Sequence, residues 1–134
     1  MYCLFLFVLS VLAATLSASF VHPGLLHTQA DFDRMAQKVA AKASPWIDSW
    51  NVLINNRHAS LGYGPRPVSY VNRGSNCKPN NVALLFNDVA AAYQLAVRWK
   101  ISGDNRYADK AVSVMNAWSS VLTGLGCQGG TGHD

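Results

Sequence analysis

Four side chains near the middle of the chain have the chemistry needed to bind an acidic sugar. They are Tyr63, Arg66, Tyr70 and Arg73. Aromatic rings stack on sugar faces, and a guanidinium pairs with a carboxylate through two parallel hydrogen bonds. The sequence therefore predicts that these residues contact a substrate. In the alternative interpretation the tyrosines anchor their segment to the core and the arginines are only solvated.

The segment that carries these residues is predicted to be a long irregular loop. Residues 56–79 contain helix and strand breakers throughout, namely Gly62, Gly64, Pro65, Pro67, Gly74 and Pro79. Loops of this length are uncommon in compact domains and are often lids or binding loops. A lid or a binding loop is therefore the expected role of this segment.

Other polar residues have a chemical and a structural interpretation. The run Asn55-Asn56-Arg57-His58 could neutralise a carboxylate, although an asparagine also terminates helices and His58 could be a surface residue. Asn80 and Asn81 precede a predicted helix, where capping competes with carboxylate binding. Asn87 and Asp88 lie inside that helix and could make either a buried polar contact or a sugar contact.

No metal or cofactor is expected. His22 and His27 flank a Pro-Gly turn, but no third ligand is evident, so structural hydrogen bonds are the simpler interpretation. Core packing, rather than a sugar platform, is expected for most of the tryptophans, which are Trp46, Trp50, Trp99 and Trp118.

Helical periodicity predicts an all-α fold built from antiparallel helical hairpins. The first hairpin follows a near capping box at Thr28 and Asp31 and resumes at Pro45. The second spans residues 80–123 and turns at Gly103 and Asp104. The inward positions are predicted to be Val82, Leu85, Phe86, Val89, Tyr93, Ala96 and Val97 in its first helix, and Tyr107, Ala111, Val114, Met115, Trp118, Val121 and Leu122 in its second.

The two ends of the chain differ from its middle. Residues 1–19 have no charged side chain and a short apolar run followed by small residues, which predicts a secretory signal peptide rather than a membrane anchor. Once that segment is removed, we expect no stable membrane insertion and an extracellular location. Residues 124–134 are glycine-rich and are expected to be a disordered tail.

Charge and cysteine content fit a secreted protein. The net charge is +4 and all seven acids are aspartates. Such an excess suits a polyanion, and secretion favours an acidic polysaccharide over nucleic acid, although charge alone favours a merely solvated surface. An oxidising compartment permits a Cys77–Cys127 disulfide; otherwise each cysteine pairs elsewhere or stays free.

Two stretches carry a family resemblance. The first is His22-Pro23-Gly24-Leu25-Leu26-His27-Thr28 followed by Asp31-Phe32-Asp33-Arg34-Met35. The second is the pattern Trp99-x4-Asp104-x2-Tyr107-Ala108-x2-Ala111, ending at Ala117-Trp118. Together they resemble the N-terminal part of the alginate lyase-like polysaccharide lyases, over most of residues 21–123.

The resemblance implies a secreted lyase with an α/α toroid fold, of which residues 20–123 would form the first part. Such enzymes cleave uronic-acid polysaccharides such as alginate or glucuronan by β-elimination. The reaction needs a neutralised C5 carboxylate, a base for the C5 proton and an acid for the leaving O4. In the family those groups lie on later helices, which nothing in this sequence matches. No catalytic residue is therefore assigned, and the chain alone is expected to be inactive.

Two other functions remain open. The first is a non-catalytic secreted module that binds carbohydrate through the Tyr/Arg loop. The second is an interaction protein that docks a partner on exposed helical faces.

Overall fold

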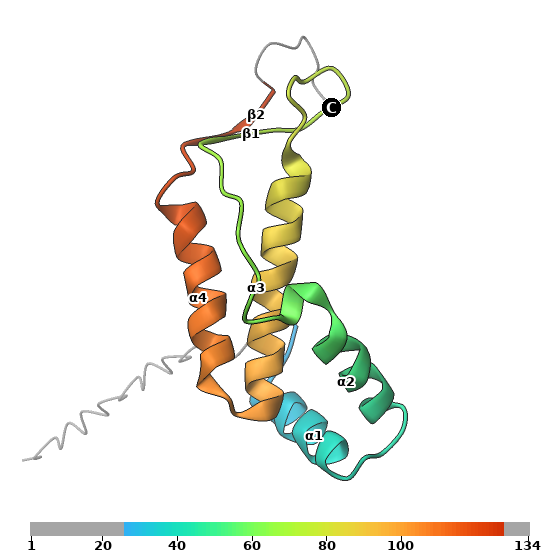
Figure 1. Cartoon of the computed structure of the whole chain (residues 1–134). Coiled ribbons are helices and arrows are strands. Elements are labelled where there is room, and N and C mark those ends of the chain that lie inside the picture. Colours follow the sequence, from blue (N-terminus) through green and yellow to red (C-terminus); the bar gives the residue numbers. More distant parts are fainter. Residues whose placement is uncertain (1–25, 128–134) are drawn as a thin grey trace, which may run out of the picture.

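The computed structural model describes residues 26–127, and these are mostly helical (Figure 1). The elements in chain order are α1 (Gln29–Ala40), α2 (Trp46–Asn55), the short 3₁₀ helix η1 (Arg57–Ala59), β1 (Tyr70–Asn72), α3 (Val82–Ser102), α4 (Asn105–Ser119) and β2 (Gly124–Gly126). The helices α3 and α4 lie side by side and antiparallel, and α1 and α2 pack near the C-terminal end of α3. The predicted signal peptide, residues 1–19, lies outside the described residues.

The capping signals predicted at Thr28, Gly103 and Asp104 are confirmed, but α4 ends at Ser119, so the predicted inward residues Val121 and Leu122 lie beyond the helix. Thr28 and Asp31 form a reciprocal capping box at the start of α1. Gly103 ends α3 in the left-handed conformation at φ 71°, and the Asp104 side chain accepts a hydrogen bond from Arg106 N at the start of α4. These signals depend on a few neighbouring residues, and tertiary packing does not override them here.

The core lies between α3, α4 and the loop that crosses them. It contains Ala91 and Leu95 of α3, Ala111 and Val114 of α4, and Tyr63 of the loop. Alanine at positions 91 and 111 keeps the two helices free of bulky side chains at their contact, so their backbones can approach closely. Burial of these apolar side chains is the main stabilisation of this part of the fold.

The predicted inward face of α3 is partly wrong. Phe86 and Val89 are 58% and 57% exposed, and Met115 on α4 is 63% exposed. The buried positions of α3 are instead Asp88, Ala91 and Leu95, which lie on a neighbouring stripe of the same helix. Phe86, Val89 and Met115 instead form part of an open apolar strip.

The chain was predicted to be entirely helical apart from an irregular loop and tail. This prediction is wrong in one respect, because the loop and the tail each contain a short strand. β1 and β2 pair in parallel, with Val71 opposite Leu125. The expectation of disorder for residues 124–134 therefore fails for residues 124–127; the rest lie outside the described residues. A Cβ at Gly124 would lie 2.7 Å from the Tyr70 ring, so glycine lets that ring lie against β2.

Candidate functional site

The structure does not bring the four predicted sugar-binding residues together. Tyr63 is buried in the core, and Tyr70 packs against the glycines of β2. Arg66 and Arg73 are both exposed, but they line two separate cavities. The four residues were predicted to act together because they are close in the sequence. In the structure the loop runs along α3 and α4, and this path separates them (Figure 1).

Tyr63 belongs to a buried hydrogen-bond network centred on Asp88. Asp88 is 1% exposed, and Tyr63 Oη donates to its Oδ1 at 2.5 Å. Its Oδ2 accepts from Arg66 N at 2.7 Å and from Trp118 Nε1 at 2.6 Å. One carboxylate thus ties α3 to α4 and to the loop. Of the two roles considered for Asp88, the structure shows the buried contact.

This network makes Tyr63 unsuited to act as a base or an acid in proton transfer. Burial, reinforced by the adjacent Asp88 carboxylate, raises the pKa of Tyr63 to about 12. A general base works best when its pKa lies near the working pH, and its oxygen must reach the substrate proton. Tyr63 meets neither condition, so it anchors the loop, as in the alternative interpretation of the sequence.

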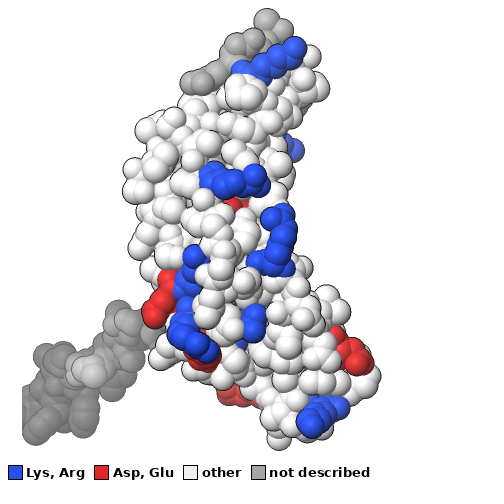
Figure 2. Space-filling view, viewed as in Figure 1, with Lys and Arg blue, Asp and Glu red and all other residues white. Residues whose placement is uncertain are grey.

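Beside this anchor lies an open, positively charged depression, which we call the loop site. Its volume is about 330 Å³, and it is lined by Arg57, Ser60, Gly62, Tyr63, Gly64 and Arg66. Between residues 26 and 127 the ion pairs are Arg34–Asp31 and Arg106–Asp104, so neither Arg57 nor Arg66 is paired with a carboxylate there. Figure 2 shows that basic side chains recur along the face of the molecule that the loop crosses.

Arg57 is held in place by a helix side chain. Its Nη2 donates to Asn87 Oδ1 at 2.9 Å, and Asn87 Nδ2 donates to Ala83 O. His58 Nε2 lies 2.9 Å from the same Asn87 oxygen, and its Nδ1 lies 3.1 Å from Asn56 Oδ1. The Asn55–His58 run therefore begins a polar cluster at the edge of the loop site. Its arginine is the residue that faces the site.

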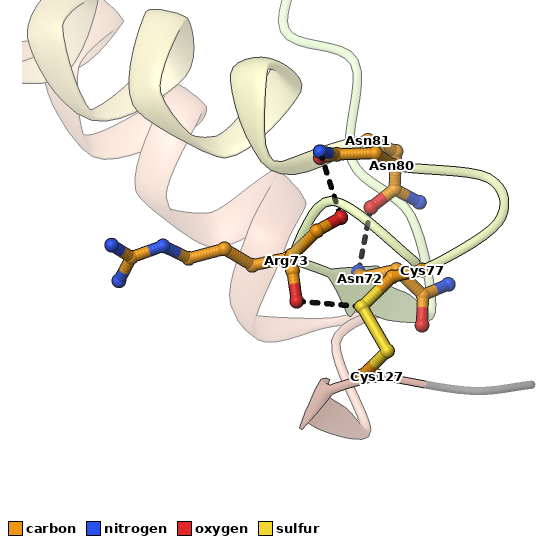
Figure 3. Close-up of a disulfide and its surroundings, with 7 residues drawn as sticks. Asn72, Arg73, Cys77, Asn80, Asn81 and Cys127 are labelled. Carbon is orange, nitrogen blue, oxygen red and sulfur yellow. Dashed lines mark hydrogen bonds between the residues drawn. A yellow bond between two sulfur atoms is a disulfide. The ribbon is translucent and has the colours of Figure 1, made fainter. Parts of the chain in front are cut away.

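Asn81 has a role that the sequence did not indicate. Its side chain does not cap α3; it accepts from Asn72 N at 2.7 Å (Figure 3). It also donates to Tyr70 O at 3.1 Å. The amide thus satisfies backbone groups along one edge of β1, as a neighbouring strand would. Asn80 donates to Gly74 O at 3.2 Å and closes the turn before α3.

The Cys77–Cys127 pairing, one of the alternatives that the sequence left open, is present. It ties the end of β2 to the loop after β1 (Figure 3). Cys77 Sγ also lies 2.8 Å from Arg73 O, a contact rather than a hydrogen bond because a disulfide sulfur carries no hydrogen. The last described residues are therefore held on the fold covalently.

Of the four tryptophans, only Trp118 lies in the core, whereas Trp46, Trp50 and Trp99 are half-buried, so core packing holds for one of them and not for most. His27 Nε2 lies 2.7 Å from Tyr93 Oη, Trp118 is buried, and Trp99 Nε1 donates to Asn105 Oδ1. His22 lies outside the described residues.

In residues 26–127, no group of three or more His, Cys, Asp or Glu side chains could hold a metal ion. No helix in that range is long and apolar enough to cross a membrane.

Comparison of the chain with models of known protein families, with curated proteins and with solved structures found no match to any of the three.

Proposed function

We propose that this chain provides the first helices of a secreted α/α toroid lyase for uronic-acid polysaccharides, and that its loop site binds the acidic sugar chain. The observation that carries the proposal is the pair Arg57 and Arg66, two exposed guanidiniums without a carboxylate partner in residues 26–127, at one open depression. Each guanidinium can hold a sugar carboxylate bidentately. The resemblance of the sequence to alginate lyase-like enzymes supplies the substrate class.

The anchor beneath the loop site supports this assignment. Arg66 N is fixed on the buried Asp88, and the Arg57 side chain is fixed on Asn87. Fixed donors lose less conformational freedom on binding than mobile ones, which favours affinity.

The proposal assigns carboxylate binding to this chain but not proton transfer. β-Elimination needs a base and an acid at the scissile bond. At the loop site, Tyr63 is committed to Asp88, and both ring nitrogens of His58 face asparagine side-chain oxygens. We therefore propose that the polypeptide alone binds uronate polymers without cleaving them.

The strip of exposed apolar side chains on α3 and α4 supports the toroid part of the proposal. Leu85, Val89, Tyr93 and Met115 line an apolar groove of about 430 Å³. Large exposed apolar patches mark surfaces that another element covers. Further helical hairpins would cover this strip in a toroid. In the second candidate function, an interaction protein, a partner would cover it.

Calorimetric titration with alginate and glucuronan oligosaccharides tests sugar binding. Loss of a bidentate guanidinium contact costs about 1.5–3 kcal/mol, so Arg57→Gln and Arg66→Gln should each weaken binding roughly tenfold or more. Lys38→Gln, which removes one charge on the exposed face of α1, is the control and should leave affinity nearly unchanged. Equal affinity in all four proteins would refute the loop site.

An ultraviolet assay for unsaturated uronate products tests the absence of catalysis. The purified chain should give no product with either polymer, and clear turnover would overturn that part of the proposal. Size-exclusion chromatography addresses the second candidate: stable association without added sugar would favour an interaction protein over a sugar-binding segment.

A further inference from the structure

A second and larger cavity lies beside the disulfide, and we call it the disulfide cavity. Its volume is about 730 Å³. Residues from β1, the loop that follows it, the first turns of α3, and β2 surround it, so its wall joins the middle of the described chain to its C-terminal end. The Cys77–Cys127 bond and the β1–β2 pairing hold these parts together.

One end of the disulfide cavity is positively charged. Arg73 is its only charged lining residue among those that the structure describes, and Asn80 adds a side-chain amide. The Arg73 side chain extends away from the disulfide (Figure 3) and has no carboxylate partner in residues 26–127. The cavity therefore offers a single guanidinium to an anionic group.

Most of the remaining wall is apolar. Val82, Leu85, Phe86 and Leu125 line it, and Phe86 and Leu125 are 58% and 63% exposed. Removing such side chains from water is favourable. A uronate polymer carries a carboxylate and several hydroxyls on every sugar, so its polar groups are poor packing partners for this apolar wall. The wall instead fits a hydrocarbon body.

From this combination we propose that the disulfide cavity binds a monocarboxylic acid with an apolar body, such as a medium-chain fatty acid. The carboxylate pairs with Arg73, and the hydrocarbon body lies against Phe86 and Leu125. Pockets of 300–1,000 Å³ with mostly apolar walls and few polar groups are typical of small-molecule sites. The proposal is independent of sugar binding, because the loop site and the disulfide cavity share no lining residue.

The disulfide has a direct part in this proposal. Leu125 reaches the cavity on a strand of three residues, β2, that is attached immediately afterwards through Cys127. A two-stranded pair this short has little stability of its own. Reduction of the disulfide should therefore release β2 and remove one wall, so the binding of the acid should require the oxidised protein.

The test is calorimetric titration of the oxidised chain with dodecanoate below its micelle concentration. Wild-type protein should bind saturably, Arg73→Gln should weaken binding at least tenfold, and Leu125→Ser should weaken it several-fold. Arg66→Gln, which removes the same charge from the loop site, is the matched control and should bind dodecanoate as wild type does. Circular dichroism of each variant verifies that the fold is retained.

Three results would overturn the proposal. They are unchanged dodecanoate affinity in Arg73→Gln, equally tight binding of uncharged dodecanol, and binding only to phosphatidylserine vesicles with none to free dodecanoate. Dithiothreitol should abolish binding, and retention of full affinity after reduction would count against the cavity as the site. Alginate oligosaccharide titrated in parallel should respond to Arg66→Gln and not to Arg73→Gln, so failure of either site is recognised separately.

Discussion

Removal of the Asp88 carboxylate should be among the most destabilising single changes in this protein. In Asp88→Ala three donors lose their acceptor at once: Tyr63 Oη, Trp118 Nε1 and Arg66 N. A buried donor without a partner costs about 1–3 kcal/mol. Part of that total is offset, because the alanine variant no longer buries a carboxylate. We therefore expect the free energy of unfolding to fall by about 3–5 kcal/mol, a large fraction of typical domain stability.

Asp88→Asn is the informative comparison. Its amide oxygen can take the place of Oδ2 and accept from Arg66 N and Trp118 Nε1. Its amide nitrogen then faces Tyr63, whose hydroxyl can rotate and accept instead of donating. Arg66 N and Trp118 Nε1 keep an acceptor, and the Tyr63 hydroxyl keeps a partner only as an acceptor; the bonds to a charged acceptor are lost. We expect a cost of about 1–2 kcal/mol, and a similar cost for Tyr63→Phe.

Urea unfolding followed by far-ultraviolet circular dichroism, with the disulfide intact, measures these differences. The predicted order of destabilisation is Asp88→Ala well above Asp88→Asn. The same order should appear in sugar affinity, because Asp88 also fixes the backbone of Arg66. Two results would contradict the idea that Asp88 stabilises the fold by pairing the three donors. They are equal stability of the alanine and asparagine variants, and a cost under about 1 kcal/mol for Asp88→Ala.

Three further predictions concern single residues. Since the pKa of Tyr63 is raised to about 12, its stabilisation is complete below pH 10 and is lost as the pH rises through 12; urea titrations should show a loss of about 2–3 kcal/mol that is missing in Tyr63→Phe. Gly103→Ala should lower stability by about 1 kcal/mol, because φ is 71° there, whereas Gly64→Ala, which meets no atom within 4 Å, should not. Gly126→Ala should lower the melting temperature because its Cβ would lie 2.7 Å from Tyr70 Oη; adding Tyr70→Phe should restore it, since the next atom is 3.7 Å away.

Local signals in the sequence were sufficient to predict the start of α1 and the turn from α3 to α4, but not the end of α4 at Ser119. Thr28, Gly103 and Asp104 act on backbone groups within four residues of themselves, so their effects can be read without the rest of the fold. The pairing of β1 with β2 could not be predicted in this way. Each strand has three residues, too few for an alternating pattern. The strands are also far apart in the sequence, because Asn72, the last residue of β1, lies 51 positions before Thr123, the residue that precedes β2.

The loop site was predicted only in part, for a related reason. Arg66 was identified because arginine has a definite chemistry, but its neighbour across the site, Arg57, was considered only within an Asn–Arg–His run. The missing information was the contact between Arg57 and Asn87, which are 30 positions apart. One signal was present in the sequence: Asp88 is a lone carboxylate on a largely apolar helix, and such a group needs donors from elsewhere in the fold.

The helix α3 shows why periodicity identified the helix but not its buried face. It carries two apolar stripes, one with Ala91 and Leu95 and the other with Val89 and Tyr93. A helix that is apolar on more than one side is normally covered on more than one side. The hydrophobic pattern favoured the stripe with larger side chains, whereas packing against α4 and the loop used the stripe with alanine. The larger stripe therefore remains open, and any helix or partner that covers it must do so without displacing the Asp88 network on the neighbouring stripe.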